Sequence, residues 1–152
     1  MLTTFWEPIK LSIIVTIAAG IIVVITGTLF GLLFAKKQFK GKILVETIFM
    51  LPLVLPPSVI GFLLIVVFGN QGVIGTWIKE IFGHSIIFTS YAAVIAATVV
   101  AFPLMFQTAK AGFQGVHRKF EEAAKDLGAT NFQVFLRVSL PLAKRALLTG
   151  TI

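Results

Sequence analysis

The sequence contains no cysteine among its 152 residues. Disulfides, thiolate metal sites and a cysteine nucleophile are therefore excluded. The chain also lacks the zinc-protease pattern HExxH, the nucleophile pattern GxSxG and the phosphate-binding pattern GxxxxGK followed by Ser or Thr. These patterns mark common hydrolases and nucleotide sites. We accordingly expect no catalytic site, no metal site and no cofactor held by this chain.

Charged residues are also scarce, at 12% of the chain against 57% hydrophobic residues, and the mean hydropathy is +1.00. This composition is too apolar for an ordinary soluble domain and is typical of an integral membrane protein. Lys and Arg number 13 against 6 acidic residues, which gives a net charge of +7. In a membrane protein such an excess first indicates the orientation of the loops, before any binding of nucleic acid.

Three apolar segments are long enough to cross a lipid bilayer as helices. The first, residues 9–35, exceeds the roughly 20 residues that a span needs, and its length argues against a signal peptide. The second, residues 43–68, is interrupted by prolines, and the third is residues 86–109. We therefore predict an all-α integral membrane protein, a polytopic helical bundle.

A fourth span begins at Ala146. From there to Ile152 the chain reaches only about 10 Å as a helix, a third of a bilayer. Neither an internal repeat nor a low-complexity linker divides the sequence. We expect residues 1–152 to form a single transmembrane domain that is incomplete at its C-terminus.

The basic residues are concentrated in two connecting segments. Residues 36–42 carry four lysines and no acid, and residues 110–145, called the polar loop below, carry seven basic and three acidic residues. Because cytoplasmic loops are enriched in Lys and Arg, both segments are predicted to be cytoplasmic, with the N-terminus and residues 70–85 outside. Trp6 and Trp77 then fall at the outer interface, where indole rings are favoured.

This orientation separates the chain's few other polar groups. His84 falls in the outer connection and His117 in the polar loop, so they cannot share a metal, and we expect ordinary loop residues. The deep parts of the spans contain no Lys, Arg or Asp. Glu46 lies near the cytoplasmic end of the second span and is predicted to pair with Lys42, four residues before it.

Small residues mark one face of the first span. Gly20, Gly27 and Gly31 follow one another at spacings of seven and four, which places them on one side of a helix. Small residues let membrane helices approach closely. We therefore predict that this face packs against another helix.

The polar loop is predicted to form two short helices around a glycine. Residues 117–127 have apolar side chains at the spacing of an amphipathic helix, and Gly128 suits its C-terminal stop. Thr130 and Gln133 fit a capping box at the start of the second helix, and Pro141 is expected to end or kink it. The apolar positions of the first helix are Phe120, Ala123, Ala124 and Leu127.

Residue chemistry alone leaves three interpretations of this helix pair. It can lie in the lipid headgroups, with its basic residues on anionic lipid, as part of a membrane-anchored regulatory or scaffold protein. It can bind DNA as a helix-turn-helix, although the second helix offers few side chains to base edges. It can also dock a cytoplasmic protein. The residue patterns do not separate the first interpretation from the third.

Two stretches of the polar loop, EAAKDLG at 122–128 and VSLP at 138–141, together resemble the EAA loop of ABC-importer permeases. That pattern is Glu-Ala-Ala, three residues, Gly, nine residues, Ile, any residue and Leu-Pro, and Val138 stands here where Ile is usual. In that family the loop is the coupling helix that fits a cleft on the ATP-binding subunit. The resemblance implies that an ATPase docks on the loop, through Glu122, Ala123, Ala124, Gly128, Val138, Leu140 and Pro141.

Three further stretches resemble the molybdate permease subunit, whose relatives carry sulfate, thiosulfate and tungstate. They are LPLVLPPSVIGFLL at 51–64, GNQGVIG at 69–75 and FPLM at 102–105. The resemblance implies a type I importer permease in the cell membrane, working as two copies with two ATP-binding subunits that hydrolyse the ATP. It also implies an extracytoplasmic molybdate-binding protein that docks on residues 70–85, and no nucleic acid partner.

The prolines of the second span suggest where an oxyanion passes. Pro56 and Pro57 lack N–H groups, so the helix should break near mid-membrane and restart around Ser58. A restarted half-helix would turn free N–H groups and the positive end of its dipole toward the interior, as discontinuous helices do at anion sites in other transporters. A simple packing kink is the alternative. Pro56, Pro57 and Ser58 are therefore candidates for the translocation pathway.

Overall fold

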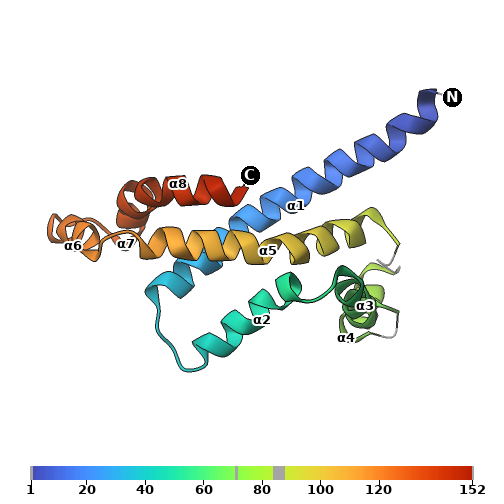
Figure 1. The fold of residues 1–152 in the computed structure, drawn as a ribbon, viewed down its shortest axis with the longest axis horizontal. Coiled ribbons are helices and arrows are strands. Elements are labelled where there is room, and N and C mark those ends of the chain that lie inside the picture. The colour runs from blue at the N-terminus through green and yellow to red at the C-terminus, as the bar shows by residue number, and fades with distance from the viewer. Residues whose placement is uncertain (1, 71, 84–87, 152) are drawn as a thin grey trace. The chain divides into compact units, whose positions relative to one another are not determined.

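The computed structural model describes residues 2–70, 72–83 and 88–151. Within these ranges the chain is almost entirely helical and has no strand, which confirms the all-α prediction. The expectation for His84 and the expected start of the third span at residue 86 fall outside the described residues. The elements are α1 (Leu2–Lys36), α2 (Lys42–Val54), α3 (Pro57–Phe68), α4 (Val73–Phe82), α5 (Ser90–Gln114), α6 (Arg118–Asp126), α7 (Asn131–Val134), the π-helical η1 (Phe135–Ser139) and α8 (Leu140–Thr151) (Figure 1).

The predicted spans correspond to α1, to the pair α2 and α3, and to α5. By length and composition, α1 from Trp6 and α5 can each cross a membrane. Helices α2 and α3 pass the same test only together, as a pair bent by 118°. The predicted break in the second span is thus present, and α3 restarts at Pro57, one residue before the expected Ser58. Pro56 precedes it with ψ of 143°, outside the helical range, because the ring of the following Pro57 disfavours a helical conformation in the residue before it.

The chain divides into two compact units, which we describe separately. The first contains residues 1–22 and 48–101. Here the structure adds a helix, α4, within the connecting segment 70–85. It starts directly against the end of α3. The approach is so close that a Cβ added at Gly72 or Gly75 would collide with carbonyl oxygens of residues 66–69. Glycine lets the two backbones approach this closely.

The second unit, residues 23–47 and 102–152, contains a core of five buried side chains. Gly27 lies against Met105, and Gly31 against Ala109, where added Cβ atoms would come within 2.6 Å of those side chains. The glycine face predicted for the first span therefore packs closely at these two positions. At Gly20 this face is not closely packed, because an added Cβ would meet no described atom within 4 Å. The core residues are Val23, Met105, Ala109, Phe113 and Ala143.

Helix α8 runs back along the C-terminal part of α5 (Figure 1). Gly112 of α5 faces Ala146, and Gly150 of α8 faces Thr108 of α5. Small residues on both helices thus allow the close contact, as is usual between membrane helices. The packing fixes both ends of the polar loop, because α5 leads into it and α8 leads out of it.

Candidate functional site

The first helix of the polar loop ends in a Schellman motif. The Gly128 N–H bonds to the Lys125 carbonyl oxygen at 2.8 Å, and the Ala129 N–H bonds to that of Ala124 at 3.1 Å. Gly128 has φ of +86°, a left-handed conformation that glycine adopts without steric cost. The predicted glycine stop is confirmed, and it reverses the chain between α6 and α7.

The second helix begins at the predicted capping box. The Gln133 N–H donates to Thr130 Oγ1 at 3.3 Å, and the Thr130 N–H donates to Gln133 Oε1 at 2.9 Å. These two bonds satisfy N–H groups that the first helical turn leaves free. The loop between the two helices is therefore held at both sides by local hydrogen bonds.

Pro141 was expected to end or kink the second helix. It does not end the helix, so the first of these two predictions is wrong. The helical path continues from α7 through the π-helical η1 into α8, and Pro141 is the second residue of α8. A proline ring clashes with the carbonyl group four residues earlier, here that of Arg137. The wider π turn lies at that carbonyl and accommodates the ring without ending the helix.

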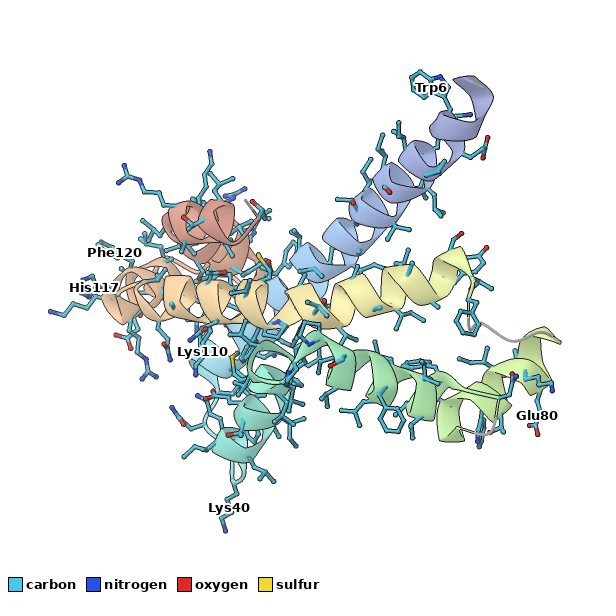
Figure 2. All side chains as sticks on the ribbon, turned by 45° about the vertical axis from the view of Figure 1, so that its right-hand side comes forward. Trp6, Lys40, Glu80, Lys110, His117 and Phe120 are labelled. Atoms are coloured by element: carbon cyan, nitrogen blue, oxygen red, sulfur yellow. The ribbon has the colours of Figure 1, made fainter. Side chains whose placement is uncertain are left out.

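The apolar residues of α6 form an exposed surface. Leu127 is 89% exposed and Phe120 is 55% exposed, Ala123 is also exposed, and only Ala124 is half-buried. His117 and Phe120 lie together at the end of the unit (Figure 2). An exposed leucine at a loop tip is unfavourable in water, and contiguous apolar surface of this kind marks interaction sites.

The charged residue of the motif also faces outward. The Glu122 side chain is 60% exposed and contacts Arg118 of its own helix at 3.3 Å, so it stays accessible to a partner. Residues of α6 and of the second helix also line an open groove of about 340 Å³. Ala124, Gly128 and Val138 line this groove together with Leu127, Gln133 and Arg137.

The last two motif residues differ in burial. Leu140 is half-buried and packs against the hydrophobic core, whereas Pro141 is exposed. The structure thus brings Glu122, Ala124, Gly128 and Val138 to one end of the loop, with Leu140 and Pro141 at its root. They are separate parts of the loop rather than one cluster.

A polar cluster absent from the sequence predictions joins three elements. Lys36 Nζ, at the end of α1, donates to Glu121 Oε1 at 2.6 Å and to Ser139 Oγ at 3.2 Å. Ser139 Oγ donates to the same Glu121 oxygen at 2.5 Å. Ser139 is fully buried, and the Glu121 side chain is 16% exposed. Because Lys36 is 85 positions from Glu121, no local pattern indicates this contact.

Two effects oppose each other in the ionisation of Glu121. Burial alone raises the pKa of this carboxyl group, but the hydrogen bonds from Lys36 and Ser139 lower it, and the charges of Lys36 and Lys125 add to this effect. The net result is a pKa below the ordinary value for glutamate. Glu121 is therefore ionised in the assembled cluster at neutral pH.

The prediction that Glu46 pairs with Lys42 is wrong. Glu46 Oε1 lies 2.7 Å from Lys110 Nζ, and both side chains are 22% exposed. Lys42 instead donates to the backbone carbonyl of Lys37 at 3.1 Å. A partly buried carboxylate is stabilised best by a cation that shares its low-dielectric surroundings, and Lys110 at the end of α5 supplies one.

The pathway candidates lie at the restart of the second span. Pro56, Pro57 and Ser58 are all exposed within their unit. Pro57 has no N–H, and the N–H groups of Val59 and Ile60 both bond to the Pro56 carbonyl oxygen. The first turn of α3 therefore offers an anion fewer free N–H groups than the four that a regular helix start leaves unsatisfied. Within the described ranges, no three His, Asp or Glu side chains gather as metal ligands.

Comparison with known proteins assigns the sequence to a family. A family model described as "Binding-protein-dependent transport system inner membrane component" matches residues 27–152. These residues include the second unit from residue 27 on, the polar loop and the broken span.

Several curated proteins are similar over nearly the whole chain. The putative molybdenum transport system permease protein YvgM of Bacillus subtilis (strain 168) is 51% identical over 148 residues, which are 97% of this chain and 65% of that protein. The molybdenum transport system permease protein ModB of Escherichia coli (strain K12) is 38% identical over 147 residues, 97% of this chain and 64% of that protein. The probable sulfate transport system permease protein cysT of Prototheca wickerhamii is 38% identical over 140 residues, 89% of this chain and 54% of that protein. The chain spans less than two thirds of the length of these relatives.

Proposed function

This chain belongs to the family of binding-protein-dependent transport system inner membrane components, and we propose that it serves as the permease of an ABC importer for molybdate. It is a multi-pass membrane protein with an EAA-type loop. In the proposed importer, it provides the path across the cytoplasmic membrane and has no catalytic site of its own. A partner subunit binds and hydrolyses the ATP that drives transport.

The exposed surface of α6 is the observation that supports this function most directly. Leu127 is 89% exposed, and the accessible Glu122 lies on the same short helix. Burying a leucine side chain in a partner's cleft contributes about 1.5–3 kcal/mol, so this surface favours association. In the proposed complex α6 is the coupling helix, and the ATP-binding subunit contacts Glu122, Ala123 and Leu127. The Schellman turn and the capping box hold it in the docking conformation.

The proposed orientation follows from the distribution of charge. Residues 36–42 and the polar loop are basic and lie on the cytoplasmic side, where the ATPase is. The N-terminus and residues 70–85 lie outside, where the molybdate-binding protein docks. Two permease copies and two ATP-binding subunits form the complex. ATP binding closes the ATPases, moves the coupling helices and rocks the permease copies between outward-facing and inward-facing states.

Pro56, Pro57 and Ser58 remain the proposed contacts with the substrate in the pathway. The break between α2 and α3 supplies neutral dipoles rather than a fixed cation. An oxyanion that meets only dipoles is bound weakly enough to be released, and selectivity is then left to the binding protein. Substrate specificity is assigned to molybdate first because two similar relatives bear molybdenum transport names. Tungstate, sulfate and thiosulfate are the alternatives.

Labelled molybdate uptake tests this function. Cells that carry the gene and cells that lack it are compared, with excess tungstate or sulfate as competitor. We expect gene-dependent uptake that tungstate blocks and sulfate leaves unchanged. Block by sulfate would transfer the assignment to sulfate, and an absence of gene-dependent uptake would contradict the importer function itself.

A further inference from the structure

The polar cluster of Lys36, Glu121 and Ser139 joins the polar loop to α1. Glu121 belongs to α6, Ser139 to η1 and Lys36 to the last turn of α1. All three groups meet within 3.2 Å, so one carboxylate oxygen accepts hydrogen bonds from both other elements. The cluster is thus a direct connection between the helix that carries the exposed docking surface and a membrane-spanning helix.

Burial of Ser139 and Glu121 favours keeping this cluster intact. Ser139 is fully buried, and Glu121 is largely so. Separating the carboxylate from its partners would leave a partly buried charge unpaired, which is unfavourable. Keeping the carboxylate paired therefore favours a joint displacement of α6 and Lys36 over a separation of the two.

The two adjacent glutamates of α6 have different surroundings. The Glu122 side chain is 60% exposed, whereas that of Glu121 is 16% exposed and contacts α1 and η1. Successive residues of a helix point about 100° apart, so one helix presents one carboxylate outward and the other inward. The docking side of α6 and its anchoring side are thereby separated.

A second ion pair lies near the other end of the segment between α1 and α2. Glu46 in α2 contacts Lys110 in α5 at 2.7 Å. Residues 36–46 are therefore held at one end by α6 and at the other by α5. The short segment between α1 and α2 thus has a charged contact with the polar loop near each of its ends.

We propose that Lys36, Glu121 and Ser139 act as a mechanical link that transmits displacement of the coupling helix to α1. They are positioning residues, and they contact neither ATP nor the transported anion. The proposal rests on the function proposed above and adds the route by which docking at α6 reaches a membrane span. Breaking the link should leave the ATPase bound and active but uncouple its cycle from transport.

The experiment compares variants of the native protein, expressed in its own host with its partner subunits. The link is broken by Glu121→Gln and by Lys36→Met, and it is rebuilt with reversed charges by Lys36→Glu combined with Glu121→Lys. Lys40→Met is the matched control, because Lys40 lies in the same basic segment and projects away from the unit (Figure 2). Each complex is purified, reconstituted with the binding protein in lipid vesicles, and assayed for ATP hydrolysis and for labelled molybdate uptake.

We expect Glu121→Gln and Lys36→Met to retain the ATP-binding subunit and to hydrolyse ATP, with uptake per ATP reduced about fivefold or more. The charge-reversed double variant should recover most of that ratio, and Lys40→Met should keep it unchanged. A role in folding alone would lower the amount of complex, not the uptake per ATP. An unchanged ratio in both single variants, or the absence of recovery in the double variant, would overturn the link. Failure of the proposed function would appear instead in the unaltered protein, as absence of ATPase or of uptake.

Discussion

Lys36 Nζ lies 2.6 Å from Glu121 Oε1, although the two residues are 85 positions apart. The contact joins the end of the first span to the helix that carries the EAA motif. It also explains why the motif is preceded by a second glutamate. Glu121 anchors α6, and Glu122 remains outside, so the two acids have different consequences when they are replaced.

The first prediction concerns how the stability contributed by Glu121 depends on pH. Because the pKa of Glu121 is lowered in the folded protein, its carboxylate adds stability above the ordinary glutamate pKa and loses that contribution as the pH falls through the lowered value. At neutral pH we expect Glu121→Gln to reduce the free energy of unfolding by about 1–2 kcal/mol. The difference should shrink below about pH 4. Thermal unfolding of detergent-solubilised protein and variant across this range measures it, and a difference independent of pH would contradict the assignment.

The second prediction concerns the glycine face of α1. A Cβ at Gly31 would lie 2.6 Å from Ala109 Cβ and 2.9 Å from the Lys110 backbone nitrogen, so Gly31→Ala must push α1 away from α5. We expect a loss of about 1–3 kcal/mol in the free energy of unfolding.

Gly20→Ala is the matched control for this substitution. It adds the same methyl group to the same helix, where no described atom lies within 4 Å. Alanine favours helix over glycine, so this variant should be as stable as the unaltered protein or slightly more stable. Equal thermal stability of the two variants would show that α1 and α5 do not pack through this face.

The third prediction concerns the turn after α6. Gly128 has φ of +86°, and a β-branched side chain there is strained by about 1–2 kcal/mol. Gly128→Val should therefore loosen the Schellman turn and weaken ATPase binding while the protein still inserts in the membrane. Pull-down of the ATP-binding subunit from solubilised membranes measures the effect.

Gly41→Val controls for backbone strain. Gly41 has φ of +87° and lies in the α1–α2 connection, away from α6 in sequence. The Gly41→Val variant should have a similar backbone strain but still bind the ATP-binding subunit. If both variants lose the ATPase to the same extent, the effect of Gly128 is general destabilisation rather than loss of the docking turn.

Local features of the loop were predictable from the sequence because their causes are local. Thr130, Gln133 and Gly128 act on backbone groups within three to five residues, and the structure has the cap and the stop where the pattern places them. The break of the second span follows similarly from Pro56 and Pro57, which lack the N–H that the ladder needs.

Features that depend on distant partners could not be predicted in this way. Lys42 was the nearest cation to Glu46 along the chain, but Lys110 lies closer in space. The cluster at Glu121 likewise depends on how α1 meets the loop. The π turn before Pro141 reflects a compromise between the ring and the packing of α8, which no single-helix rule describes.

The central claim is that the exposed surface of α6 docks an ATP-binding subunit. Its most direct test is the affinity of the solubilised permease for that subunit, with Leu127→Asp and Glu122→Lys compared against Lys40→Glu. Losing a buried leucine contact worth about 1.5–3 kcal/mol corresponds to roughly a tenfold to hundredfold weaker complex. The account predicts a loss of this size for Leu127→Asp, a clear loss for Glu122→Lys, and unchanged affinity for Lys40→Glu. Unchanged affinity in both α6 variants would contradict it.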